Sequence, residues 1–351
     1  MSLKSIMDSA ESPPVASRRR RWLGCLLPFL LVIGLAAAGG LYLNRHRDLI
    51  PVPPLSEGCE VDNADGVVDL SVTQMGNAGT IAAVAIGRNL PERAVTISLA
   101  TAMQESRLEN LTAGDRDSIG LFQQRPSQGW GTPAQIGDPV YATNKFLDKL
   151  VQIPGYAQIP LTVAAQDVQH SGYPDAYAQH EADATTLAGA LTGRVPASMN
   201  CTVNSVGTAA PGAVSSDGLQ PGASVVAKAL TKDFGPTVRP VAGAVAAGAV
   251  PSASSGASAA PSGSASGSSS ASGSAAPARG LNLAVGTPRS ASGKQRGWAV
   301  AQWAVAHCQQ LHISAVSYAG LTWQSGRASA QGWQRVAPTA SAASVLITVA
   351  G

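Results

Sequence analysis

The sequence lacks the residue patterns of several common metal, cofactor and nucleophile sites. His170 and His180 lie ten residues apart with no cysteine nearby, which is not a zinc pattern. The stretch VDNADGVVDLSV has the glycine of a calcium-binding loop, but Val61 and Val72 then occupy its first and last positions, where carboxylates are needed. Neither a phosphate-binding glycine loop nor a Ser/His/Asp arrangement is evident. The sequence therefore predicts no metal and no cofactor.

Charged residues are also scarce, at 13% of the 351 residues, and they are unevenly divided. Residues 59–201 hold 8 Lys and Arg against 15 Asp and Glu, a net charge of −7, whereas residues 202–351 hold 9 against 2, a net charge of +7. The acidic segment argues against nucleic-acid binding, which depends on neutralising phosphates. The basic segment suits contact with an anionic polymer, and an ordinary solvated surface explains it equally well.

One long run has no charge at all. The 22 residues from Trp22 to Leu43 are uncharged, and a helix rising about 1.5 Å per residue would cross a bilayer over that length. Arg18–Arg21 precede the run, and the positive-inside rule places the N-terminus in the cytoplasm and everything after Leu43 outside. We therefore expect a single-pass membrane protein with extracellular domains. A signal peptide cleaved within the small residues Ala36–Gly40 is the alternative.

Composition divides the remaining chain into folded segments and connectors. The Ala/Gly/Ser/Pro-rich segment 202–279 cannot bury enough apolar surface to fold, so we expect it to be a disordered linker. The predicted parts are a cytoplasmic tail (1–21), a transmembrane helix (22–43), a proline-containing spacer (44–58), a first globular domain (59–201), an Ala/Gly/Ser/Pro-rich linker (202–279) and a small C-terminal domain (280–351).

Apolar periodicity predicts a mainly α fold for the first domain and a small α+β fold for the C-terminal domain. In the first domain we expect helices at 80–89, 91–108, 141–151, 161–170 and 175–191, with a long irregular segment between 106 and 139. In the C-terminal domain we expect a helix at 298–311 and strands at 313–318, 321–324 and 345–349. Four tryptophans lie there, Trp298, Trp303, Trp323 and Trp333. We expect them to form its core; stacking on sugar rings is the alternative.

The cysteines agree with an oxidising compartment. Cys59 and Cys201 bracket the helix-rich segment, so we expect a disulfide that ties its two ends together. Closing so long a loop would stabilise the folded state by about 4–5 kcal/mol in the chain-entropy model. Two unrelated thiols are the alternative. Cys308 has no partner in this scheme.

One glutamate ends a mostly apolar helical run. Glu105 lies at helical spacing from a row of small residues, Ala94, Ser98, Thr101 and Ala102. Such a face is expected to pack closely against another element, which would place the carboxyl group at the inner end of the helix. Lost hydration favours the protonated carboxyl, which can then act as a general acid. A surface ion pair with Arg107 or Arg116 is the alternative.

The residues around Glu105 resemble a known enzyme family. Glu105-Ser106, a loop and then Gly120-Leu121-Phe122-Gln123 resemble the Glu-Ser and Gly-Leu-Met-Gln motifs of soluble lytic transglycosylases. The run GDRDSIGLFQ is similar to the Gly-Asp-Arg…Gly-Leu-Met-Gln run of goose-type lysozymes. VAAQDVQHSGYPDAY lies where the transglycosylases carry Ala-Tyr-Asn-Ala-Gly. The bracketing cysteines and QQRPSQGWGT resemble a lysozyme-like branch found in secreted proteins of high-GC Gram-positive bacteria.

The resemblance covers roughly residues 78–191 and implies a lysozyme-like helical fold that acts on peptidoglycan. Glu105 would protonate the glycosidic oxygen of the MurNAc–GlcNAc β-1,4 bond, and Ser106 would help to orient it. Gln166 and Asp167 replace the Tyr-Asn pair of the third motif. The residues expected to line the glycan cleft are Gly120, Leu121, Phe122, Gln123 and Gln124, with the glycine allowing close backbone approach.

The type of cleavage depends on a second carboxylate. An inverting hydrolase needs a base about 6.5–9.5 Å from the acid to activate water. Asp115 matches the goose-type Gly-Asp-Arg aspartate, with Asp117 as a substitute. Goose-type enzymes also carry an aspartate where this chain has Arg125. We therefore favour lytic cleavage, in which Glu105 acts as acid and then as base while the muramic acid hydroxyl closes an anhydro ring. A polar turn is the alternative interpretation of GDRDS.

These observations predict a membrane-anchored, peptidoglycan-cleaving enzyme. Its expected partners are peptidoglycan strands, the membrane through residues 22–43, and cell-wall polymers through the basic C-terminal segment. The alternatives are an inverting lysozyme-type hydrolase that uses Asp115, a glycan-binding protein without catalysis, and an envelope scaffold.

Overall fold

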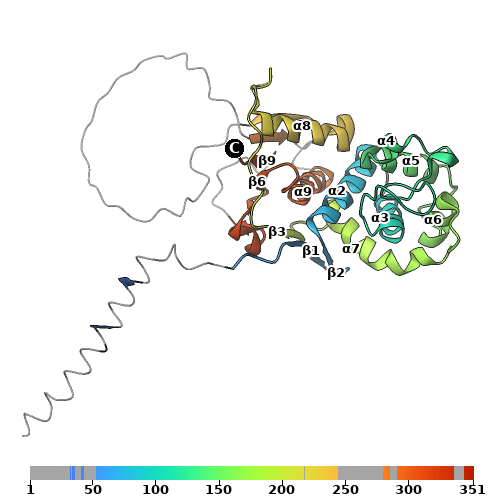
Figure 1. Cartoon of the computed structure of the whole chain (residues 1–351), viewed down its shortest axis with the longest axis horizontal. Coiled ribbons are helices and arrows are strands. Elements are labelled where there is room, and N and C mark those ends of the chain that lie inside the picture. Colours follow the sequence, from blue (N-terminus) through green and yellow to red (C-terminus); the bar gives the residue numbers. More distant parts are fainter. Residues whose placement is uncertain are drawn as a thin grey trace, which may run out of the picture. The chain divides into compact units, whose positions relative to one another are not determined.

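A computed structural model describes residues 32, 34–35, 41–42, 53–216, 218–243, 280–284, 291–335 and 344–351. The chain separates into two compact units, residues 1–54 and 55–351. The second unit contains both antiparallel sheets and all of the elements that bear on the candidate site (Figure 1).

A small sheet joins the two ends of the helical region. Its strands β1 (Gly58–Asn63), β2 (Gly66–Leu70) and β3 (Met199–Thr202) are antiparallel in the order β2-β1-β3. In this register Cys59 lies opposite Cys201, and the predicted disulfide is confirmed. The β1–β2 hairpin occupies the stretch that has the glycine of a calcium loop. It is a turn between two strands, with Gly66 at a positive φ of 147°.

The chain between β2 and β3 is helical. The predicted helices are confirmed with shifted ends, and the segment 106–139, expected to be irregular, contains a 3₁₀ turn and one four-residue helix. The elements are α2 (Val72–Gly87), α3 (Glu92–Ser106), the 3₁₀ turn η2 (Pro126–Gln128), α4 (Pro133–Ile136), α5 (Pro139–Leu150), α6 (Leu161–Gln169), the 3₁₀ turn η3 (Ala176–His180) and α7 (Glu181–Leu191).

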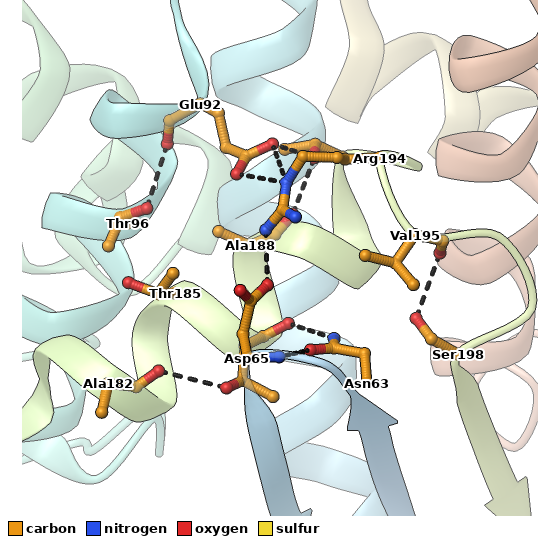
Figure 2. Close-up of polar contacts among 12 residues, drawn as sticks. Asn63, Asp65, Glu92, Thr96, Ala182, Thr185, Ala188, Arg194, Val195 and Ser198 are labelled. Carbon is orange, nitrogen blue, oxygen red and sulfur yellow. Dashed lines mark hydrogen bonds and ion pairs between the residues drawn. The ribbon is translucent and has the colours of Figure 1, made fainter.

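An arginine fastens the small sheet to the helices. Arg194, which follows α7, donates from Nη2 to Asp65 at 2.7 Å and from Nε to Glu92 at 2.9 Å (Figure 2). Asp65 lies in the β1–β2 turn and Glu92 is the first residue of α3. Thr192 donates a further hydrogen bond to Glu92 Oε2 at 2.8 Å. The turn, the start of α3 and the end of α7 are thereby held together by charge-assisted hydrogen bonds.

The second sheet is built from the C-terminal part of the chain. Its strands are antiparallel in the order β4-β5-β9-β6-β7-β8, and α8 and α9 pack against it. The elements are α8 (Pro221–Phe234), the 3₁₀ turn η4 (Gly235–Thr237), β4 (Pro240–Gly243), β5 (Gly280–Ala284), α9 (Ala291–Ala306), β6 (Ile313–Tyr318), β7 (Leu321–Gln324), the 3₁₀ turn η5 (Arg327–Gln331), β8 (Gln334–Arg335) and β9 (Ser344–Val349).

The C-terminal tryptophans form core contacts. Trp298, Trp303 and Trp323 are buried, and Trp333 packs edge-on against Trp298 with ring centroids 5.2 Å apart. The prediction that they serve as core is confirmed. Two of their N–H groups reach the small sheet, since Trp333 Nε1 donates to the Met199 carbonyl at 2.9 Å and Trp323 Nε1 donates to Asn200 Oδ1 at 3.0 Å. Cys308 is buried as well, and burial raises the pKa of its thiol to about 12.

Helix α2 is shared between the helical region and the C-terminal part. It packs against α3, α5 and α7 as well as against α8 and α9 (Figure 1). Glycines permit the close approach. A Cβ on Gly79 would lie 3.0 Å from the His307 ring, and a Cβ on Gly87 would lie 2.5 Å from the Phe234 carbonyl oxygen. Burial of α2 therefore requires elements from both parts of the unit.

A buried polar cluster closes the junction of α2, α8 and α9. The Asp233 carboxylate accepts hydrogen bonds from Trp303 Nε1 at 2.8 Å and from the Thr80 hydroxyl at 3.1 Å. The same hydroxyl lies 3.1 Å from His307 Nε2. His307 Nδ1 faces the Trp303 carbonyl at 2.8 Å; because a carbonyl only accepts, that nitrogen carries a proton. Burial raises the pKa of Asp233 and lowers the pKa of His307.

The predicted fold class is wrong. The described residues form two antiparallel sheets besides the helices, so the fold is mixed rather than mainly α. The strands of the small sheet have six, five and four residues, too few for alternation to stand out in the sequence. The predicted linker 202–279 contains α8 and β4, while residues 244–279 lie outside the described residues. Residues 59–201 and 280–351, predicted as separate domains, belong to one compact unit.

The predicted membrane assignment is also corrected. Residues 22–43 lie outside the described residues except at 32, 34–35 and 41–42. In the part of the chain that the structure describes, no helix combines the length and the apolar character needed to span a membrane. Its longest helices, α2 and α9, have 16 residues each, whereas about 20 are needed. The described helices therefore provide no membrane span, contrary to the predicted single-pass assignment and to the N-inside, C-outside localisation derived from it.

The packing of α2 on α9 predicts that a larger side chain at Gly79 destabilises the fold. Gly79→Leu should lower the free energy of unfolding by about 1–3 kcal/mol, because the added atoms meet His307 and Ala306. Gly172→Leu is the matched control, since a Cβ there has no neighbour within 4 Å. Urea denaturation followed by circular dichroism measures both. Equal midpoints for Gly79→Leu and the parent would contradict the packing.

Candidate active site

Helix α3 carries Glu105 in its last turn. The small residues predicted to face another element, Ala94, Ser98, Thr101 and Ala102, are all buried. The helix ends because Arg107 and Leu108 adopt positive φ angles of 56° and 61°. Two side chains from α2 hold this end, with Gln74 Nε2 donating to the Arg107 carbonyl at 2.8 Å and Asn77 Nδ2 to the Leu108 carbonyl at 2.7 Å.

The Glu105 carboxylate is half-buried and is held by a tyrosine. The Tyr177 hydroxyl, from η3, donates to Glu105 Oε1 at 2.7 Å. Tyr177 is fully buried, and this burial together with the nearby carboxylate raises its pKa well above the ordinary value. The hydroxyl therefore stays protonated and remains a donor at physiological pH. Among the described residues, no hydrogen-bond donor contacts Oε2 of Glu105.

The neighbouring Gln104 connects α3 to the same turn. Gln104 Oε1 lies 2.9 Å from Gln179 Nε2 and 3.0 Å from His180 Nε2. Burial lowers the pKa of His180, which favours the neutral imidazole near pH 7. The position of η3, and with it the Tyr177 hydroxyl, is thus fixed from two adjacent residues of α3.

The loop after α3 is locked to the helix. The buried Ser106 hydroxyl donates to the Leu121 carbonyl at 2.8 Å or to the Ala102 carbonyl at 3.0 Å. Ile119 and Gln124 exchange backbone hydrogen bonds of 3.0 Å, so residues 119–124 form a tight turn. Gly120 has a φ of 78°, and a Cβ there would lie 2.8 Å from the Ile136 carbonyl oxygen. The requirement for glycine comes from this packing.

Three residues predicted to line the cleft have buried side chains. Leu121 and Phe122 are fully buried, and Phe122 stacks on Phe146 with ring centroids 4.7 Å apart. The Phe122 carbonyl accepts from Gln169 Nε2 at 2.8 Å. Gln124 is buried too, with Nε2 donating to the Ala142 carbonyl. These side chains shape the loop and cannot touch a ligand without moving.

Gln123 lies at the surface of the loop. Its side chain is half-buried, and Nε2 donates to the Gly120 carbonyl at 3.1 Å. A Cβ on Gly114 would overlap Gln123 Oε1, so Gly114 lies directly against this side chain. Residues 114 and 123 are therefore neighbours.

The two predicted water-activating aspartates have different surroundings. Asp115 is 80% exposed and pairs with Arg125 Nη2 at 3.1 Å. Asp117 accepts from the Ser127 amide at 2.8 Å and from its hydroxyl at 3.0 Å. These hydrogen bonds lower the pKa of Asp117. Asp117 thus fastens the start of η2, and Asp115 projects into solvent beside an arginine.

The two residues of the third motif have different surroundings: Gln166 is hydrogen-bonded within the protein, and Asp167 is exposed. Gln166 and Ser171 hydrogen bond reciprocally, Nε2 to carbonyl and hydroxyl to Oε1, both at 3.0 Å. Asp167 is exposed. The residue of this stretch that reaches Glu105 is Tyr177, which sequence reasoning missed. Tyr177 is the last residue of VAAQDVQHSGYPDAY, the stretch that was compared with the third motif of the transglycosylases. Because that motif contains a tyrosine, the comparison could have pointed to Tyr177.

Two cavities in the described part of the chain lie around α8 and not at Glu105. One, of about 310 Å³, is lined by residues from 209–214, 220–223 and 349–351. The other is lined by residues from 215–240, including Lys228 and Arg239. Glu105 and Tyr177 line neither, so the candidate site rests on hydrogen-bond geometry.

No protein-family model matches the chain, and no curated protein matches it either.

The hydrogen bonds to Asp117 predict an acid-sensitive loop. A carboxyl whose pKa is lower in the folded state stabilises that state above its ordinary pKa of 3.8 and loses this contribution as the pH falls. Amide hydrogen exchange at Ser127 should therefore accelerate as the pH is lowered below about 4, after correction for intrinsic rates. In Asp117→Asn that dependence should vanish. The Ile136 amide, bonded to the Thr132 carbonyl, is the internal control.

Proposed function

We propose that this protein cleaves the glycan strands of peptidoglycan at the MurNAc–GlcNAc β-1,4 bond, with Glu105 as general acid. The observation that carries the proposal is the Tyr177 hydrogen bond to Glu105 Oε1 at 2.7 Å, beside the loop that Ser106 locks to α3. While the Tyr177 hydroxyl donates to it, Oε1 is an acceptor. The proton to be transferred then belongs on Oε2, to which no described residue donates.

The chemistry proceeds by proton transfer in two directions. Glu105 Oε2 gives its proton to the glycosidic oxygen as the bond from that oxygen to C1 of MurNAc breaks. The resulting carboxylate then takes the proton of the MurNAc C6 hydroxyl while that oxygen bonds to C1. One residue thus serves as acid and then as base, and the product carries an anhydro ring without the addition of water.

Two features of Asp115 support this lytic outcome over hydrolysis. A water-activating carboxylate must be held at a defined position on the far side of the sugar. Asp115 lies on an exposed loop, and one of its oxygens is engaged by Arg125. A base in that state is poorly placed to take a proton from water. We therefore retain the lytic transglycosylase as the proposed activity.

Removal of the Glu105 proton should abolish cleavage. Glu105→Gln keeps the shape but cannot donate to the leaving oxygen, so turnover should fall by about 10²–10⁴-fold. Purified cell wall is digested with the full-length protein, and the released muropeptides are identified by mass spectrometry. Binding to wall should persist, because the 119–124 turn is unchanged. Digestion by the variant at the parent rate would refute the enzyme and leave a glycan-binding role.

Loss of the Tyr177 hydroxyl should weaken catalysis more than it weakens the fold. Tyr177→Phe removes the donor to Oε1, so the carboxyl can turn away from its productive position, and we expect a loss in turnover of about 10-fold, comparable to one hydrogen bond to a charged group. Tyr173→Phe is the matched control, because Tyr173 is 79% exposed. Initial rates and thermal midpoints are compared. Equal rates for the two variants would exclude a positioning role for Tyr177.

A further inference from the structure

Arg125 is anchored on one side and free to engage a carboxylate on the other. Its side chain is 21% exposed, compared with 80% for its partner Asp115. Nε donates to the buried Ser118 hydroxyl at 3.2 Å, and Nη2 donates to Asp115 Oδ2 at 3.1 Å. The Arg125 carbonyl also accepts the Gln128 amide at 3.0 Å, which ties its backbone to η2. The guanidinium is the anchored member of the pair, and Asp115 is the exposed one.

The pair lies at the loop cluster that contains the candidate site. Gly114 lies against the Gln123 side chain, and Ile119 pairs with Gln124 immediately before Arg125. Ser106, the residue after Glu105, is bonded to Leu121 within the same turn. One short segment thus connects the general acid at one end with the Asp115–Arg125 pair at the other.

We propose that Arg125 selects the product of the reaction by holding the exposed Asp115 carboxylate in an ion pair, in which it does not take a proton from water. This inference rests on the proposed glycan cleavage. With Asp115 bound to Arg125, no base activates water, and the MurNAc C6 hydroxyl closes on C1. Arg125 is a positioning residue, since it acts through Asp115 and needs no contact with the sugar.

Release of Asp115 would open a second route at the same bond. The Asp115 carboxylate takes one proton from water, the water oxygen bonds to C1, and the bond from C1 to the glycosidic oxygen breaks. The leaving oxygen receives its proton from Glu105. The product then carries a reducing end in place of an anhydro end, and the two products differ by one water, which mass spectrometry resolves.

The test compares the ratio of reducing to anhydro ends released from purified cell wall by the full-length protein and its variants. Arg125→Gln should raise this ratio about three- to tenfold, since exposed ion pairs are weak and only partly restrain Asp115. Arg125→Gln/Asp115→Asn should restore the parent ratio. Arg116→Gln is the matched control: Arg116 is 73% exposed, its Nε lies 3.9 Å from the same oxygen, and the ratio should not change.

Each result has a distinct meaning. Release of muropeptides with an unchanged ratio in Arg125→Gln would overturn the role of Arg125 and leave the proposed function standing. Absence of release by the parent protein would overturn both. If Arg125→Gln is unfolded by circular dichroism, Arg125→Lys replaces it. Lysine keeps the charge but cannot bond Ser118 and Asp115 with a planar fork, so it should raise the ratio by about twofold; an unchanged ratio again overturns the proposal.

Discussion

Helix α2 can be buried only from two sides at once, and the rest of the unit depends on this constraint. Its residues are mostly Ala, Gly, Ile and Val, and they are buried against α3, α5 and α7 on one side and α8 and α9 on the other. A helix that is apolar all round belongs inside a protein. The hydrogen bonds among Asp233, Thr80 and His307 determine how α2, α8 and α9 are oriented against one another, because buried polar groups must be hydrogen-bonded.

The same helix connects the C-terminal part to the candidate site. Its exposed end supplies Gln74 and Asn77, which hold the carbonyls where α3 stops, two and three residues after Glu105. The position of the carboxylate is thus determined by α2 from one side and by Tyr177 from the other. Helix α9, far along the chain, packs against this same helix α2.

Sequence reasoning succeeded where the signal is local and failed where it depends on the fold. The long helices and the strands β6, β7 and β9 have enough periodic residues to be recognised, and Cys59 and Cys201 bracket their segment. Helix α8 was missed because Val226, Leu230 and Phe234, its buried stripe, sit in Ala/Gly/Ser/Pro-rich sequence. The contact of Tyr177 with Glu105 spans 72 residues, and no local pattern encodes it. The burial of Leu121 and Phe122 likewise depends on a tertiary contact, the packing of their loop against α5.

The two-sided burial of α2 has a consequence for the order of events during synthesis. Helix α2 leaves the ribosome roughly 200 residues before α9 is complete. At about 5–20 residues per second, that interval lasts about 10–40 s. Throughout it, the glycine and alanine strip that α9 will cover stays open to water or to a chaperone. The helical region therefore cannot reach its final state before α9 has been made, and a later segment of the chain completes the interior of an earlier one.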